Sequence, residues 1–145
     1  TSYTSQLIAL VLFSLICDGV DGSLAIYGGR VSKFGELYDS IADRITEALW
    51  LVGATFVGVP VRWAIAIWVL GATQEYARAR LASLGYSEIG VVTPTERPVR
   101  AIFVIAVTLV FWFGYDIATE IAIGFTILQA ISVLIVMRMA RSILR

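Results

Sequence analysis

Asp18-Gly19-Val20-Asp21 and Asp39-Ser40-Ile41-Ala42-Asp43 place four carboxylates inside two apolar stretches of this chain. The stretches run from about Ser5 to Ile26 and from about Ser32 to Val57. A helix needs roughly 20 apolar residues to cross a bilayer, and each stretch is about that long. Backbone amides have no water to bond inside lipid, so we expect both stretches to be helical. The acids therefore lie on two consecutive predicted transmembrane helices.

The rest of the chain continues the same pattern. Three further hydrophobic helices are predicted, over about Val59 to Leu84, Pro98 to Tyr115 and Ile117 to Arg141. Of the 145 residues, 59% are hydrophobic and 15% are charged, whereas soluble domains are about 45–50% apolar. This composition leaves too few polar residues to cover a core in water. We predict an all-α, multi-pass transmembrane helical bundle that forms a single domain over residues 1–145.

Basic residues gather on one side of this predicted bundle. The connection after the first helix carries Arg30 and Lys33, and most arginines lie in the longest connection, at its edges or near the C-terminus. The opposite connections carry acids and only one basic residue, Arg62. Since lysine and arginine mark the cytoplasmic side of a membrane protein, we predict a protein of the cell membrane whose basic side faces the cytoplasm.

The composition also excludes several functions. Eleven basic and eleven acidic residues give a net charge of zero, which argues against a nucleic-acid partner, because such a protein needs a basic surplus. The chain contains no histidine, so Ser-His-Asp and Cys-His catalysis and histidine-ligated zinc are excluded. Cys17 is the only cysteine, so neither an intrachain disulfide nor a thiolate metal cluster can form.

The spacing of the four aspartates places each pair on one helix face. Asp18 and Asp21 are three residues apart, and Asp39 and Asp43 are four apart, which are the spacings of neighbours on a helix surface. A charge at the centre of a membrane helix costs about 2.5–3.5 kcal/mol, and four converging carboxylates repel one another unless a cation lies between them. Oxygen ligands suit Mg²⁺, Mn²⁺ or Ca²⁺, so we predict one hard-metal site. The alternative is that the acids pair with nearby bases, namely Arg30, Lys33 and Arg44.

The same residues resemble a family signature. The pattern Asp18-x2-Asp21-Gly22-x2-Ala25, followed by Gly35-x3-Asp39-x3-Asp43, is similar to that of the CDP-alcohol phosphotransferases. Three further runs resemble members that make phosphatidylinositol phosphate or phosphatidylglycerol phosphate: Asp43-Arg44-Ile45-Thr46-Glu47, Tyr76-Ala77-Arg78-Ala79-Arg80 and Thr95-Glu96-Arg97-Pro98. Two features depart from the family. It has six transmembrane helices, so the five found here suggest an incomplete N-terminus, and Ile26 stands where the signature has arginine.

The resemblance implies an activity and a role for each signature residue. Family members transfer a substituted phosphate from a CDP-linked lipid donor to a small polar alcohol in the membrane, releasing CMP, and homodimers are known among them. Asp43 would be the general base. The resemblance also implies two bound ions of Mg²⁺ or Mn²⁺. Their implied ligands are Asp18, Asp21, Asp39 and Asp43. The implied nucleotide-binding residues are Asp18, Asp21, Gly22, Ala25 and Gly35.

Arginines on the predicted cytoplasmic side are candidates for binding the acceptor. A guanidinium fork binds phosphate through two hydrogen bonds, which suits a phosphorylated acceptor such as inositol phosphate or glycerol phosphate. The candidate acceptor-phosphate residues are Arg78, Arg80, Arg97 and Arg141. The alternative for each is that it only marks the cytoplasmic side.

Three other functions remain as alternatives. An aspartate-rich membrane prenyltransferase is disfavoured, because its acidic motifs lie far apart, whereas only 17 residues separate Asp21 from Asp39. A divalent-cation transporter and an inactive relative of the phosphotransferases are favoured by Ile26. Measuring CMP release would discriminate among these hypotheses.

Overall fold

The computed structural model describes residues 2–27, 32–86 and 92–144, and for residues 2, 18 and 21–27 it describes the helical backbone alone. Within these ranges the chain forms five α-helices and no strand. They are α1 (Ser2–Tyr27), α2 (Lys33–Thr55), α3 (Val61–Ser83), α4 (Arg97–Trp112) and α5 (Ala118–Ile143). The predicted all-α fold and its five helices are therefore confirmed.

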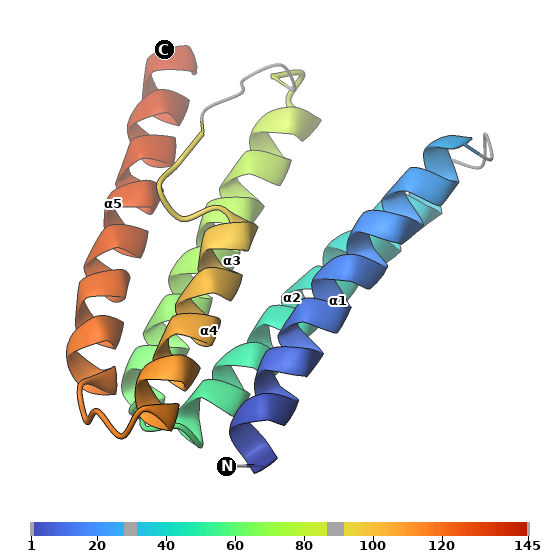
Figure 1. Ribbon diagram of the computed structural model, residues 1–145. Helices are drawn as coiled ribbons and strands as arrows, with labels where there is room; N and C mark the ends of the chain where they lie inside the picture. The colour runs from blue at the N-terminus through green and yellow to red at the C-terminus, as the bar shows by residue number, and fades with distance from the viewer. Residues whose placement is uncertain (1, 28–31, 87–91, 145) are drawn as a thin grey trace.

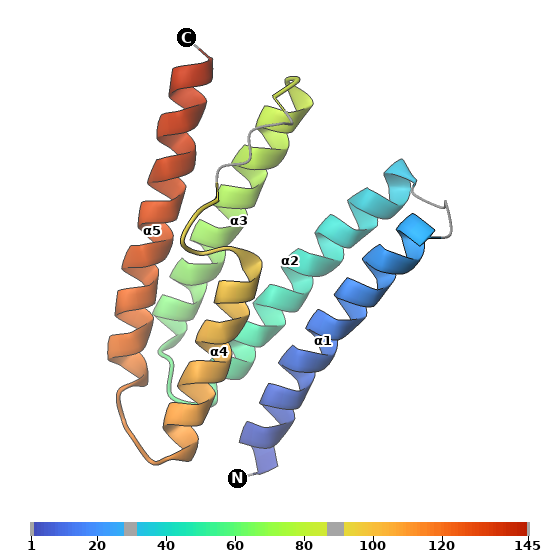
Figure 2. The ribbon, with the colours of Figure 1, turned by 45° about the horizontal axis from the view of Figure 1, so that its top comes forward.

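The helices alternate in direction along the bundle. α1 and α2 form an antiparallel hairpin, α3 packs most extensively on α5, and α4 contacts α1, α2 and α5 between these two pairs (Figure 1, Figure 2). The N-terminus and the turns after α2 and α4 lie at one end, whereas the C-terminus and the turn after α3 lie at the other. We call the latter the basic end, because Arg78, Arg80, Arg138 and Arg141 lie in the halves of α3 and α5 that reach it.

The connection between α3 and α4 determines where the arginines of α4 lie. In both ribbon views residues 92–96, which we call the returning connection, lead from the side of the basic end back to the start of α4 inside the bundle. Pro98 occupies the first turn of α4, where a missing N–H costs no helical hydrogen bond. Arg97 and Arg100 therefore start α4 well inside the bundle, beside α2 and α3, and not at its rim.

Glycines end three of the helices. Gly58, Gly85 and Gly114 follow α2, α3 and α4, and each has a positive φ, of 97°, 94° and 81° respectively. This left-handed conformation is strained for residues with a Cβ atom but accessible to glycine. Each glycine thus lets the chain turn after its helix. The helix ends accordingly fall within a few residues of their predicted positions.

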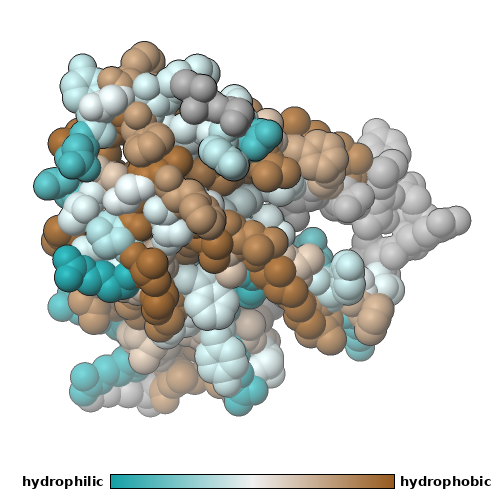
Figure 3. All heavy atoms as spheres, turned by 90° about the horizontal axis from the view of Figure 1, so that it is seen from below, coloured by the Kyte–Doolittle hydropathy of each residue, from teal (hydrophilic) through white to brown (hydrophobic). Residues whose placement is uncertain are grey.

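The bundle buries polar and charged groups beside its apolar core, which includes Ile67 and Val104. Gln74, Gln129, Ser132, Glu47 and Arg100 are buried, with at most 4% of each exposed. Large apolar side chains are exposed on all five helices, among them Phe13 at 65%, Leu49 at 63% and Leu134 at 57%. In the view from below, brown apolar side chains lie at the surface among white and teal ones (Figure 3).

One described helix, Ala118–Ile143, is long and apolar enough to cross a membrane, with a hydropathy of 2.1 over its most apolar window. Residues Tyr3–Cys17 form a shorter apolar helix. The multi-pass arrangement therefore stays a prediction.

Candidate functional site

The acids of α2 lie on one helix face and become more buried along it. Asp39 is exposed, Asp43 has a side chain 20% exposed, and Glu47 has one 3% exposed. Trp50, which follows on the same face, is 4% exposed. The spacing of three or four residues aligns these side chains along the helix. We call Asp43, Glu47 and Trp50 the α2 stripe.

Arg97 of α4 lies along the α2 stripe and contacts all of its members. Its Nη2 atom is 2.8 Å from Oδ1 of Asp43, and its Nε atom is 3.9 Å from Oε1 of Glu47. Its guanidinium carbon is 5.6 Å from the centre of the Trp50 ring, within the range of a cation–π interaction. Trp50 in turn donates its indole N–H to Ser14 Oγ of α1 at 3.0 Å. One arginine thus connects α4 to the acidic face of α2.

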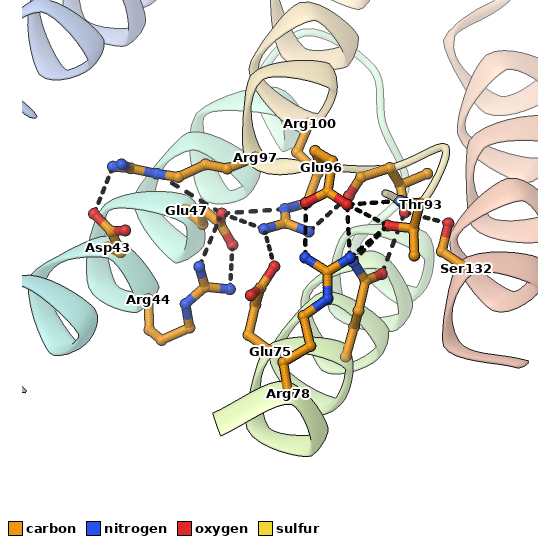
Figure 4. A network of polar contacts seen from close by, with 12 residues as sticks. Asp43, Arg44, Glu47, Glu75, Arg78, Thr93, Glu96, Arg97, Arg100 and Ser132 are labelled. Atoms are coloured by element: carbon orange, nitrogen blue, oxygen red, sulfur yellow. Dashed lines mark hydrogen bonds and ion pairs between the residues drawn. The ribbon is translucent and has the colours of Figure 1, made fainter. Parts of the chain in front are cut away.

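Glu47 is the centre of a buried ionic network (Figure 4). Oε1 of Glu47 accepts hydrogen bonds from Nε and Nη2 of Arg100, at 3.1 and 2.9 Å. Arg44 binds both oxygens of Glu47, at 2.9 and 3.3 Å. Arg100 also donates to Glu75 at 3.2 Å and to the Thr95 carbonyl at 2.8 Å. Its side chain is 5% exposed and that of Glu47 is 3% exposed, so the contact between them forms away from water.

Arg78 and Glu96 form a second ion pair that joins α3 to the start of α4. Nη1 and Nη2 of Arg78 lie 2.9 and 2.7 Å from the two oxygens of Glu96, the bidentate geometry of a strong pair. The backbone N–H and the hydroxyl of Thr93 also donate to Glu96, each at 2.8 Å. The hydrogen bonds from Arg78 are the main cause that lowers the pKa of Glu96 to about 2, and those from Thr93 add to it.

Uncharged polar side chains join α3, α5 and the connection before α4. Gln129 of α5 donates to Oε1 of Gln74 on α3 at 2.9 Å, and Gln74 donates to Thr93 Oγ1 at 2.9 Å. Thr95 donates to Ser132 of α5 at 2.7 Å. Gln74, Thr95, Gln129 and Ser132 are all fully buried. These bonds fix the returning connection, and with it the start of α4, against α3 and α5.

A cavity of about 880 Å³ opens among α2, α3 and α5, beside the ionic network and toward the basic end. Its charged lining comprises Asp43 and Arg44 from α2, Glu75 and Arg78 from α3, and Glu96. Tyr76, Tyr86 and Met139 contribute to the rest of the wall. A volume of this size fits a small polar molecule. The lining offers guanidinium donors for an anion and carboxylate acceptors for hydroxyl groups.

The structure brings some of the predicted site residues together. Asp43 and Arg78 line the cavity, and Arg97 binds Asp43 directly. Arg80 is exposed and hydrogen-bonds Ser83 at 3.4 Å. Three other predicted residues lie outside the cavity lining and are exposed, namely Asp39, Gly35 and Arg141.

The predicted metal and nucleotide residues of α1 fall largely outside the description. The backbone places Asp18, Asp21, Gly22 and Ala25 on α1, but their side-chain surroundings lie beyond the described atoms. Among the side chains that are described, no group of three or more Asp, Glu, His or Cys residues could hold a metal ion. The four-aspartate metal site therefore stays a prediction.

Sequence reasoning missed the counter-ions of the α2 acids. It considered only nearby bases, and of these Arg44 does bind Glu47. The pairing of Asp43 with Arg97 and of Glu47 with Arg100 spans more than 50 residues of sequence, so no local pattern indicates it. Glu75 was missed as well. Its one available signal was its position three residues before Arg78, which places both on one face of α3.

Comparison with known proteins places this sequence in a family. The chain matches the sequence model of the CDP-alcohol phosphatidyltransferases over residues 2–142. Archaetidylinositol phosphate synthase of Aeropyrum pernix is 33% identical over 125 residues, which cover 86% of this chain and 64% of that protein. The synthase of the same name from Pyrococcus horikoshii is 34% identical over 99 residues, or 64% of this chain and 52% of that protein.

A bacterial relative gives a similar match. Phosphatidylinositol phosphate synthase of Cutibacterium acnes is 32% identical over 110 residues, which cover 70% of this chain and 52% of that protein. The chain thus spans about half to two thirds of the length of these curated relatives. No solved structure matches the chain. The match over residues 2–142 covers the α2 stripe, the ionic network and the cavity, and it shows that the chain belongs to the CDP-alcohol phosphatidyltransferase family.

Proposed function

We propose that this protein transfers a phosphatidyl-type group from a CDP-linked lipid to a phosphorylated polyol and releases CMP. Family membership supports the donor and the leaving group. The names of the relatives, which are synthases of archaetidylinositol phosphate and phosphatidylinositol phosphate, support inositol phosphate as the acceptor. Glycerol phosphate is the second acceptor that the sequence favours.

The observation that carries this proposal is the composition of the cavity wall. Asp43 and Arg44 of α2 face the same cavity as Glu75 and Arg78 of α3. A phosphorylated polyol carries an anionic group, which guanidiniums bind. It also carries hydroxyl groups, which donate hydrogen bonds to carboxylates. An acceptor in this cavity would lie beside the carboxylate that the sequence assigns as general base.

Asp43 has the surroundings that such a base requires. Its carboxylate is 20% exposed, and Arg97 holds one oxygen at 2.8 Å. We propose that Asp43 accepts the proton of the attacking hydroxyl, because a carboxylate within hydrogen-bond reach of a substrate can act as a general base. Arg97 would then orient this carboxylate and contact the phosphate of the acceptor.

The chemistry of the donor set fits Mg²⁺ or Mn²⁺. Asp39 and Asp43 lie one turn apart on α2 and offer carboxylate oxygens, the ligands that these ions prefer. Asp18 and Asp21 are spaced to share a face of α1, which runs antiparallel to α2. A bound divalent ion would neutralise the pyrophosphate of the donor and stabilise the departing CMP.

The distribution of side chains supports a multi-pass membrane protein. Phe13, Leu49 and Leu134 are exposed on three different helices, whereas Glu47 and Arg100 are buried between helices. Charged groups inside a membrane face the bundle interior and pair there, as these two do. We infer that the bundle lies in the membrane with its basic end on the cytoplasmic side.

The decisive experiment is a CMP-release assay with purified protein in mild detergent. The donors would be the CDP-linked archaetidyl and phosphatidyl lipids, and the acceptors would be inositol phosphate, glycerol phosphate, inositol and glycerol. We expect release to require Mg²⁺ or Mn²⁺ and to be fastest with a phosphorylated acceptor. Equal rates with inositol and inositol phosphate would contradict the proposed phosphate recognition.

An inactive relative is the second candidate, and Ile26 favours it. Isoleucine stands where the family signature has an arginine that can reach donor phosphates. We propose that the chain is nevertheless active, because it keeps all four costly aspartates of the signature. If neither the parent protein nor Ile26→Arg releases CMP with any acceptor, the inactive reading holds.

A further inference from the structure

We propose that Glu47 is a positioning residue, which fixes the guanidinium of Arg97 so that this group can bind the acceptor phosphate. Glu47 belongs neither to the aspartate signature nor to the cavity wall. It acts in this proposal through Arg97 and does not itself touch the substrate. The inference rests on the proposed function, since it assigns Arg97 to the phosphate of the acceptor.

The burial of Glu47 is the first argument. Its side chain is 3% exposed, less than that of any other charged partner in the network. Removing a carboxylate from water is costly, and unpaired it would be strongly destabilising. Two arginines, Arg44 and Arg100, donate four hydrogen bonds to it. A carboxylate held this firmly is a fixed negative charge inside the bundle.

The orientation of Arg97 is the second argument. Glu47 faces the Nε edge of this guanidinium at 3.9 Å, whereas Asp43 contacts Nη2 at 2.8 Å. The distance to Glu47 is too long for a hydrogen bond but short for two charges in a mostly buried site. Glu47 thus attracts the inner edge of the group, and Asp43 binds its outer edge. An incoming phosphate competes with Asp43 and leaves the contact with Glu47 in place.

The charge balance of the network is the third argument. Among the described side chains, the ion pairs join four carboxylates to four guanidiniums: Asp43, Glu47, Glu75 and Glu96 to Arg44, Arg78, Arg97 and Arg100. Glu47 alone attracts three of these arginines, from both α2 and α4. Without its charge, Arg97 and Arg100 would repel each other across the stripe. Arg97 would then lose the orientation that presents Nη2 toward Asp43.

The test uses inorganic phosphate as the probe, with the whole chain in detergent. Thermal stabilisation as a function of phosphate concentration gives its apparent Kd, because a ligand that binds the native state raises stability by mass action. Four variants are compared with the parent: Glu47→Gln, Glu47→Asp, the charge-balanced double variant Glu47→Gln/Arg100→Gln, and the control Glu120→Gln. Glu120 is an exposed acid of α5 at the opposite end.

We expect Glu47→Gln and the double variant to weaken phosphate binding roughly tenfold to hundredfold, the effect of a small misplacement of a binding group. Glu47→Asp should lose less, and Glu120→Gln should match the parent. In the CMP-release assay the KM of the acceptor should rise by a similar factor while the KM of the donor changes less than about twofold.

Two results would overturn the inference. If the double variant binds phosphate as tightly as the parent, Glu47 only offsets the charge of Arg100. If the parent itself does not bind phosphate, Glu47 does not position Arg97 for phosphate binding. Should Glu47→Gln fail to fold, the double variant and Glu47→Asp decide the matter. The proposed function is judged separately, because a parent that binds phosphate but releases no CMP refutes that function and still reports on Glu47.

Discussion

Replacing Arg100 by methionine tests whether the ionic network holds the bundle together. Arg100 donates to Glu47 through Nε and Nη2, to Glu75 through Nη2 and to the Thr95 carbonyl through Nη1. Methionine keeps an unbranched stem beside Gly71, where the arginine stem now packs. The substitution therefore removes the charge and the donors while it preserves most of the packing.

The expected loss of stability follows from the burial of the pair. Removing one partner of a buried salt bridge costs about 3–5 kcal/mol, because the other charge stays buried without compensation. Glu47 would keep both hydrogen bonds from Arg44. We therefore expect the lower part of this range, about 3 kcal/mol, for Arg100→Met.

The measurement is the free energy of unfolding of the purified protein in detergent, by denaturant titration. The matched control is Arg141→Met, an exposed arginine of α5, for which a change within about 0.5 kcal/mol is expected. Adding Glu47→Gln to Arg100→Met should recover part of the loss, because both members of the pair are then neutral. A loss below about 1 kcal/mol for Arg100→Met would refute the reasoning that this network stabilises the fold.

Three further predictions concern the candidate site. Arg97→Ala should raise the KM of the acceptor roughly tenfold to 150-fold, the value of a charge-assisted phosphate contact, and equal effects on donor and acceptor would place Arg97 elsewhere. Asp39→Asn should abolish the metal-dependent release of CMP, and full activity of the parent in excess EDTA would contradict the metal site. Glu96 has a pKa lowered from 4.5 to about 2, so its contribution to stability is present above about pH 4.5 and is lost as the pH falls toward 2. Glu96→Gln should remove this part of the acid transition, which unfolding measured between pH 6 and pH 2 would show.

The fold could be predicted because its signals are local. Apolar stretches of membrane length gave five helices, and the turns after three of them coincide with glycines of positive φ, Gly58, Gly85 and Gly114. Pro98 marked the start of α4 to within one residue. Each of these signals depends on a few consecutive residues, so it can be recognised without knowledge of the partners.

The site could be predicted only in part, because its contacts join distant segments. Helical spacing indicated that Asp39, Asp43 and Glu47 share a face of α2, and in the structure the burial of these side chains increases along that face. The sequence could not show how far α4 begins inside the bundle. That depth comes from the returning connection, where Thr93 and Thr95 form hydrogen bonds with Gln74 of α3 and Thr95 donates to Ser132 of α5.

The depth of α4 also changes what its arginines do. In the sequence, Arg97 and Arg100 follow the longest connection and are typical of residues that mark the cytoplasmic side of a membrane. In the structure their side chains are 15% and 5% exposed and neutralise the acids of α2. Both roles are compatible, because a charged residue near the membrane surface can orient the chain during insertion and pair inside the bundle after folding. The zero net charge of the chain therefore does not mean that charge is unimportant here: among the described residues, the buried acid Glu47 of α2 is paired with Arg100 of α4, and Asp43 is paired with Arg97.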